Sequence, residues 1–327
     1  MNKVAAFVGQ RLFKAVFILL AIVIINFALV RAAPGDPAVI MAGEAGAADE
    51  QYVEQLRERF GLDEPLYKQL FTYITQVAQG DLGYSYRQDQ PVRDLVLDRL
   101  PATLLLTGIA YVLALALGIF LGTVAAMNVG RWTDTAVTTL ALLAYATPLF
   151  WVGLMMILLF SVQLGWLPAF GYESVGAGFT GMGHALDVAA HLVMPVVTLA
   201  LFYMAVYARL TRSSILEVRD MDYVKTARAK GLKEGRIVTL HILRNAILPV
   251  ITFAGIQAGH LIGGSILVET VFAWPGIGRL AFDALLQRDY QILLGIFVVT
   301  SVMVLIFNII TDLIYTLIDP RIEVAVR

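Results

Sequence analysis

The stretch Thr135–Gln163, TAVTTLALLAYATPLFWVGLMMILLFSVQ, contains no Asp, Glu, Lys or Arg, and Ala246–Val268 is equally free of charge. A helix needs about 20 apolar residues to cross the ~30 Å hydrocarbon core of a bilayer, so each stretch is long enough. The whole chain has 327 residues, of which 59% are hydrophobic and 15% charged. Because soluble domains are about half apolar and a quarter charged, this composition excludes an ordinary soluble enzyme and indicates an integral membrane protein.

Six apolar stretches predict an all-α integral membrane protein with six transmembrane helices. They are Leu12–Val30, Ala102–Met127, Thr135–Val162, Leu192–Ala208, Ala246–Val268 and Ile292–Thr311. The fourth is short, and we expect its helix to begin close to Pro195, since proline is tolerated near a helix start. The first reads alternatively as a signal peptide, but its apolar core is longer than the usual ~7–15 residues. We therefore expect an uncleaved span.

The distribution of basic residues predicts the orientation. Fifteen of the 24 Lys and Arg residues fall in segments that are cytoplasmic if both termini are cytoplasmic, and such an excess marks the cytoplasmic side. Residues 31–101 hold twelve acidic and seven basic residues and two stretches of helical spacing, Gln51–Phe60 and Leu66–Val77. The predicted organisation is a cytoplasmic N-terminus and first span (1–30), an extracytoplasmic helical cap (31–101), a five-span core (102–316) with a cytoplasmic loop (209–245), and a cytoplasmic tail (317–327).

The loop 209–245 has the most informative local sequence. Ser214–Glu217 has the spacing of a capping box and predicts a helix start, and Asp222 lies where a helix N-terminus favours negative charge. Gly231 fits the left-handed position that follows a helix end, and a second helix is expected from Lys233 into the fifth span. Small residues on the first helix suit docking into another protein: they are Thr226, Ala227 and Ala229. The alternative is a basic loop without a partner.

Residues 222–232, DYVKTARAKGL, followed by LRNA at 243–246, resemble the cytoplasmic loop of binding-protein-dependent ABC importer permeases. The general pattern there is Glu-Ala-Ala, three residues, Gly, nine residues, Ile-x-Leu-Pro, and only Ala227, Gly231 and Leu243 follow it strictly. The departures resemble the first permease of dipeptide and oligopeptide importers. Further stretches similar to that subfamily are Pro34–Pro37, Phe60–Leu66, Gly80–Gly83, Leu100–Thr103, Gly263–Ser265 and Phe272–Gly276.

This resemblance implies a type I ABC importer permease whose short helix before Gly231 couples to a separate ATPase. The residues that match the coupling loop are Asp222, Tyr223, Lys225, Thr226, Ala227, Arg228, Gly231, Leu243, Arg244 and Asn245. The implied partners are a homologous second permease, two ABC ATPases carrying ATP and Mg, an extracytoplasmic substrate-binding protein and the lipid of a bacterial inner membrane. Dipeptides or oligopeptides are the expected substrates, with nickel complexes or glutathione as alternatives.

Several other kinds of site are not expected. The net charge of −1 gives no signal for nucleic acid, and the chain has no cysteine and no Gly-Lys dipeptide, hence no P-loop for a nucleotide. We therefore expect no catalytic residue, metal or cofactor on this chain. The G-x-G-x-x-G match at Gly176–Gly181 lies in a short loop between spans rather than in a βαβ unit. His184 and His191 are better explained as interfacial histidines than as metal ligands.

Polar residues inside the spans are candidates for the translocation pathway, because they are costly in lipid. The three we select are Gln257, His260 and Asn308. Gly255, Gly259 and Gly263 recur every fourth residue, as do Gly118 and Gly122, and such ridges let helices approach closely. They serve either packing within the chain or contact with a partner permease.

Two competing functions have sequence requirements of their own. A self-contained secondary transporter or channel is expected to show inverted repeats or intramembrane charges. An intramembrane enzyme needs a paired nucleophile and base or a metal motif such as His-Glu-x-x-His. The charge-free spans argue against the transporter or channel, and the sequence has no His-Glu-x-x-His and no Ser/His or Asp/Asp pair at membrane depth for the enzyme.

The orientation can be tested with reporters. A reporter at Gln79 should be extracytoplasmic, while reporters at Glu234 and Arg327 should be cytoplasmic, because the basic residues accumulate on their side. Labelling of position 234 by a membrane-impermeant reagent in intact cells would overturn this topology.

Overall fold

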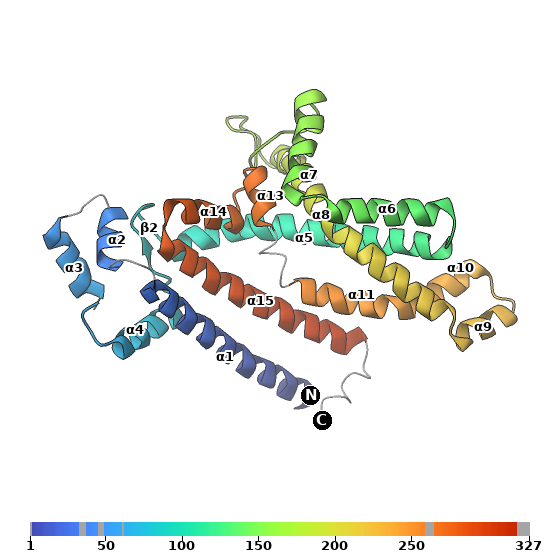
Figure 1. Ribbon diagram of the computed structural model, residues 1–327, viewed down its shortest axis with the longest axis horizontal. Helices are drawn as coiled ribbons and strands as arrows, with labels where there is room; N and C mark the ends of the chain where they lie inside the picture. The colour runs from blue at the N-terminus through green and yellow to red at the C-terminus, as the bar shows by residue number, and fades with distance from the viewer. Residues whose placement is uncertain (1, 33–36, 45–48, 61, 259–264, 319–327) are drawn as a thin grey trace. The chain divides into compact units, whose positions relative to one another are not determined.

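The computed structural model describes residues 2–32, 37–44, 49–60, 62–258 and 265–318 (Figure 1). These residues are mostly helical, as expected, and fall into two compact units. The first unit comprises Met1–Pro101 and Gly276–Ile309, and the second comprises Ala102–Pro275 and Ile310–Arg327. Two long helices, α5 and α15, contribute residues to both units.

The first unit combines N-terminal helices, a short hairpin and part of the C-terminal region. Its elements are α1 (Asn2–Ala32), α2 (Pro37–Glu44), α3 (Glu50–Phe60), α4 (Leu66–Ala78), β1 (Tyr84–Ser85), β2 (Gln90–Pro91), the start of α5 (Val92–Met127), α14 (Ile277–Gln287) and most of α15 (Tyr290–Ile318). The helices expected at Gln51–Phe60 and Leu66–Val77 are confirmed as α3 and α4. In addition, the antiparallel hairpin, in which Tyr84 pairs with Pro91, was not expected.

A polar contact ties the hairpin to the start of α15 within this unit. The buried Ser85 hydroxyl donates a hydrogen bond to Oδ2 of Asp289, which is also buried. The other oxygen of Asp289 accepts the backbone N–H of Ile292 at 3.2 Å, so this carboxylate caps the first turn of α15. Beside it, the start of α5 packs against α14 and α15 through an apolar cluster that includes Val92, Val96 and Ile277.

The second unit is built around α8. Its elements are the remainder of α5, α6 (Trp132–Ala146), α7 (Leu149–Met156), the π-helical turn η1 (Ile157–Gln163), α8 (Met182–Arg219), α9 (Asp222–Ala229), α10 (Glu234–Ile237), the π-helical turn η2 (Val238–Ile242), α11 (Leu243–Ala258) and α13 (Ile266–Val271). Helix α8 contacts α6, α7, α11 and α13, and Figure 1 shows it running beside α6 and α11. It is therefore the central helix of this unit.

Two glycines bring α5 close to α8. A Cβ atom at Gly118 would lie 2.4 Å from Tyr207 Cβ, and one at Gly122 would lie 2.5 Å from the carbonyl oxygen of Ala208. Contacts this short leave no room for a side chain, so the Gly118 and Gly122 ridge serves packing within the chain. In the other ridge Gly255 is buried in α11, whereas Gly259 and Gly263 lie outside the described residues.

Two prolines lie in the expected spans and have different effects on their helices. The expected third span, Thr135–Val162, is divided into α6 and α7, which meet at an angle of 102°. Its cause is Pro148, because a residue before proline avoids the helical region, and Thr147 is extended with φ −79° and ψ 132°. By contrast, Pro195 does not mark a helix start. It lies buried inside α8, which begins at Met182.

Four described helices are long and apolar enough to cross a membrane by length and composition. They are Val92–Met127, Met182–Arg219, Glu234–Gln257 and Tyr290–Thr311, and the bent pair Trp132–Ala146 and Leu149–Gln163 makes a fifth if it is one crossing. Residues Phe13–Leu29 of α1 form a shorter apolar helix. These helices agree with an integral membrane protein, while the count of six spans stays a prediction.

A buried polar network closes α13 onto α5 in the second unit. Oε1 of the fully buried Glu269 accepts hydrogen bonds from the hydroxyls of Thr103 at 2.8 Å and Ser265 at 2.9 Å. The indole N–H of Trp274, also fully buried, donates to the carbonyl of Ala102 at 2.8 Å. Buried polar groups are costly unless they are paired in this way, so the network fixes where α13 lies against α5.

Replacement of the close-packed glycines should separate α5 from α8. Gly122→Ala places a methyl group against the backbone of α8, and such overpacking should lower the free energy of unfolding by about 1–3 kcal/mol. Thermal unfolding of the purified protein measures the effect. Gly108→Ala is the matched control, because its Cβ meets no atom within 4 Å. Equal loss of stability in both variants would contradict the close approach.

Candidate functional site

The candidate site is the loop between α8 and α11, which carries α9. Helix α8 continues to Arg219, and α9 begins after Met221. The capping-box reading of Ser214–Glu217 is therefore wrong: Ser214 lies inside α8, where it is buried together with Ile215. Burial of this side of α8 keeps the helix continuous through Ser214, because tertiary packing overrides a local helix-start signal.

Gly231 ends α9 as the sequence predicted. It has φ +76°, and the hydrogen bonds from Gly231 N to Arg228 O (2.9 Å) and from Leu232 N to Ala227 O (3.4 Å) complete a Schellman motif. A Cβ atom on Gly231 would meet nothing within 4 Å. The requirement for glycine is thus a matter of backbone conformation alone, because residues with a Cβ atom disfavour positive φ.

One side of α9 is buried on an apolar cluster. Val224 and Ala227 of α9 pack with residues from α5, α8, α10, η2 and α11: Ala126, Ile215, Val218, Ile237, Ile242 and Ala246. Leu232 and Leu243 pack at its margin. Ala227 was expected to be exposed on the docking surface, but it lies in this cluster instead, where a small side chain permits close packing. The cluster holds α9 against the ends of the neighbouring helices.

The opposite side of α9 is exposed and polar. Of the expected coupling residues in α9 and the turn after it, the following are exposed: Asp222, Tyr223, Lys225, Thr226, Arg228 and Gly231. Lys225 Nζ lies 3.0 Å from Asp222 Oδ1 one turn earlier. This side therefore presents charges and the small residues Thr226 and Ala229, which suits contact with another macromolecule.

Tyr223 and Asn245, both selected from the sequence, meet in the structure. The amide of Asn245 donates to the Tyr223 hydroxyl oxygen at 2.9 Å and to the carbonyl of His241 at 3.0 Å, and the Tyr223 hydroxyl donates to the same carbonyl at 3.3 Å. This small network fastens α9 to the start of α11. Arg244 beside it is exposed.

An ion pair across the Gly231 turn was missed by the sequence reasoning. Arg228 of α9 donates two hydrogen bonds to Glu234 of α10, at 2.8 and 3.3 Å. Hydrogen bonding to Glu234 is the main cause that raises the pKa of Arg228, so the guanidinium stays charged. The sequence carries a signal for this ion pair, since opposite charges stand on either side of the glycine that ends α9. The pair bridges the two short helices of the loop.

The candidate pathway residues fall in different places. Gln257 is half-buried in α11, Asn308 is exposed on α15, and His260 lies outside the described residues. Gln257 and Asn308 belong to different compact units, so neither unit contains both of them. Their role in a pathway stays a prediction.

The two histidines that were considered as metal ligands both have partners within the chain. His184 Nε2 lies 2.6 Å from Glu173 Oε2, and His191 Nδ1 lies 2.8 Å from the carbonyl of Asp187. Gly181 and Gly183 flank the first residue of α8, Met182. In the described part of the chain no group of three His, Cys, Asp or Glu residues is arranged to hold a metal ion.

The chain is similar to known transport proteins over nearly its whole length. Residues 118–324 match the family described as "Binding-protein-dependent transport system inner membrane component", and residues 4–107 match the N-terminal model "Binding-prot-dependent transport system membrane comp, N-term". The chain is 41% identical over 321 residues to "Oligopeptide transport system permease protein AppB" of Bacillus subtilis, covering 98% of this chain and 99% of that protein. It is 40% identical to "Di/tripeptide transport system permease protein DppB" of Pseudomonas aeruginosa, covering 97% of this chain and 98% of that protein.

Solved structures agree at the level of the fold. The inward-facing MetNI methionine ABC transporter matches with a TM-score of 0.55 and 18% identity over 69% of this chain and 96% of that chain. An amino acid ABC transporter with histidines matches with a TM-score of 0.51 and 19% identity over 68% and 92% of the two chains. The expected type I importer permease fold is thereby confirmed.

The network that fastens α9 to α11 makes a quantitative prediction. Tyr223→Phe and Asn245→Leu each remove the same hydrogen bond, so each should speed amide hydrogen exchange in α9 by the equivalent of about 0.5–1.5 kcal/mol. The double variant should lose less than the sum of the two single variants, because both single variants already lack the hydrogen bond between the two side chains. Thr239→Val is the control, since that hydroxyl bonds within its own helical segment to the carbonyl of Gly235. Additive effects would show that the two side chains act independently.

Proposed function

Because the chain belongs to the family of binding-protein-dependent transport system inner membrane components, we propose that it forms half of the translocation pathway for dipeptides or oligopeptides in an ATP-driven importer. The family establishes the class of protein, a permease subunit of an ABC importer. Relatives about 40% identical over nearly the full chain are named as oligopeptide, di/tripeptide and dipeptide permeases, which supports peptides as the cargo.

The observation that carries the mechanism is the construction of α9. An eight-residue helix rests on an apolar cluster, ends at a left-handed glycine and exposes a polar outer side. In our proposal α9 is the coupling helix, and Asp222, Tyr223, Lys225, Thr226 and Arg228 contact a cytoplasmic ATPase. Ala227 and Leu243 support α9 from the apolar cluster. Gly231 ends the helix, Asn245 holds it through Tyr223, and Arg244 lies beside that contact.

The proposed coupling role implies which partners this chain has. The permease pairs with a homologous second permease and with two ABC ATPase chains, on which ATP and Mg are bound. An extracytoplasmic binding protein delivers the substrate. This chain holds no cofactor or metal in the proposal and binds membrane lipid but no nucleic acid. Both termini lie on the cytoplasmic side of the bacterial inner membrane, and residues 31–101 form the extracytoplasmic cap.

Transport proceeds by alternating access between the two permeases. Closure of the ATPases on ATP displaces α9, and the apolar cluster transmits that displacement to α8, α10 and α11, whose residues it contains. Gln257, His260 and Asn308 are the proposed polar residues of the pathway. Nickel complexes and glutathione are the alternative cargoes, and a binding screen on the associated binding protein distinguishes them.

Substitution of Gly231 tests the coupling role. Gly231→Val should cost roughly 1–2 kcal/mol of backbone strain, because a β-branched residue disfavours the left-handed conformation. The variant should insert normally, while ATP hydrolysis no longer responds to the loaded binding protein. Gly231→Ala should be milder and Gly231→Asn milder still, since Asn tolerates this conformation better.

Stimulated ATPase activity and peptide uptake, at matched membrane levels, are the measurements. Gly235→Ala is the matched control, since Gly235 lies in α10 without a positive φ and its Cβ meets nothing within 4 Å. Wild-type activity across the whole Gly231 series would remove the coupling role from this loop. Peptide uptake without any added ATPase chains would instead identify a secondary transporter.

A further inference from the structure

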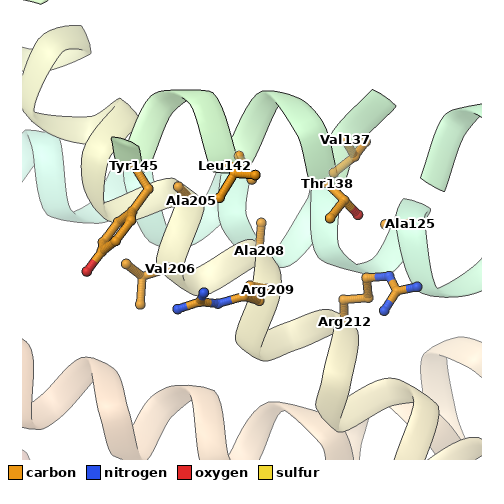
Figure 2. A pocket seen from close by; sticks show the side chains of 11 residues that line it. Ala125, Val137, Thr138, Leu142, Tyr145, Ala205, Val206, Ala208, Arg209 and Arg212 are labelled. Atoms are coloured by element: carbon orange, nitrogen blue, oxygen red, sulfur yellow. The ribbon is translucent and has the colours of Figure 1, made fainter. Parts of the chain in front are cut away.

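A pocket of about 290 Å³ lies in the second unit among α5, α6 and α8 (Figure 2). Its wall is largely apolar and includes Val137, Leu142 and Val206, while Thr138, Tyr145, Arg209 and Arg212 contribute polar groups. The volume is close to the lower end of the usual range for small-molecule sites, about 300–1,000 Å³, and a mostly apolar wall with few polar groups is typical of such sites.

The two arginines of the pocket are in different electrostatic states. Arg212 donates two hydrogen bonds to the carboxylate of Asp134, at 2.7 and 2.9 Å, so its charge is neutralised. Arg209, nearly one turn earlier on α8, forms no ion pair in the described part of the chain. Its guanidinium carbon lies 5.9 Å from the centre of the Tyr145 ring. The pocket therefore contains one uncompensated cation beside an aromatic side chain.

Arg209 and Tyr145 are both exposed in the described chain, so the direction of the Arg209 side chain decides whether it belongs to the pocket or to a surface that faces lipid. Asp134 pairs with Arg212 and Tyr145 stacks on Phe202 at 5.4 Å, so α6 and α8 run antiparallel. Figure 2 shows Arg209 directed along α8 toward Tyr145, away from the end of α8 that carries Arg212. In the proposed orientation that direction leads away from the cytoplasm. An arginine that faced lipid would extend toward the headgroups instead.

We propose that Arg209 and Tyr145 form a subsite that binds the C-terminal carboxylate of the transported peptide on its way through this permease. This inference rests on the proposed function, since it assumes a peptide cargo. Every linear peptide has a terminal carboxylate whatever its sequence, and guanidinium binds carboxylates through two parallel hydrogen bonds. The apolar wall accepts the last side chain by size rather than by a specific polar contact.

The chain contains no cysteine, so Leu142→Cys places a single thiol in the wall of the pocket. The assembled transporter is treated with N-bromoacetyl-dialanine or with its C-terminal amide, and the alkylation rate of this thiol is divided by that with bromoacetamide. A charge-assisted hydrogen bond contributes about 1.5–3 kcal/mol, so the carboxylate probe should react roughly tenfold faster or more. Arg209→Gln should remove the preference and Arg209→Lys should retain part of it.

Arg131→Gln is the matched control, because Arg131 is an exposed arginine outside the pocket; it should keep the preference. Equal rates for the two probes, or a preference that survives Arg209→Gln, would overturn the subsite. A preference that appears in phosphatidylcholine membranes but vanishes when phosphatidylglycerol is added would also overturn it, because the pocket would then hold an anionic lipid headgroup. Absence of ATP-dependent peptide uptake with the preference intact would refute the proposed function and leave the carboxylate site.

Discussion

The close approach of α5 to α8 at Gly118 and Gly122 is the contact on which the second unit depends. Helix α8 has 38 residues, about 57 Å at 1.5 Å per residue, so it extends beyond the ~30 Å hydrocarbon core. Its C-terminal part carries Ile215 and Val218 into the cluster beneath α9, and Ala126 of α5 joins the same cluster. The separation of two membrane helices therefore sets the position of the short helix that is proposed to meet the ATPase.

Charge is scarce in this chain, and three arginines of the second unit illustrate different uses of it. Arg212 is neutralised by Asp134 within the helix bundle, and Arg228 is paired with Glu234 across the turn after α9. Arg209 keeps its charge and faces an aromatic ring in an apolar pocket. The first two pairs fix the relative positions of neighbouring helices, whereas the third cation is available to a ligand.

Local features of the fold could be predicted from the sequence, and features that depend on distant partners could not. The turn at Gly231 was predictable because the left-handed conformation is a property of one residue and its neighbours. The helix start at Ser214 failed because burial of Ile215 extends α8 through it. A helix is divided at Pro148 but continues through Pro195, which lies buried inside α8, so a proline alone does not predict a break. The meeting of Tyr145 with Arg209 had no signal at all, because the two residues lie on separate helices.

The buried carboxylate of Glu269 has a consequence for how this protein is made. Its partner Thr103 precedes it by 166 residues, so the ribosome completes α5 to α11 before the hydroxyl of Thr103 meets its acceptor. Until then the segment that becomes α13 has to keep the carboxyl group of Glu269 in contact with water, because a polar group without a hydrogen-bond partner is costly in hydrocarbon. Insertion of the earlier helices therefore comes before α13 settles, and the last third of the nascent chain completes the interior of a unit begun by the first third.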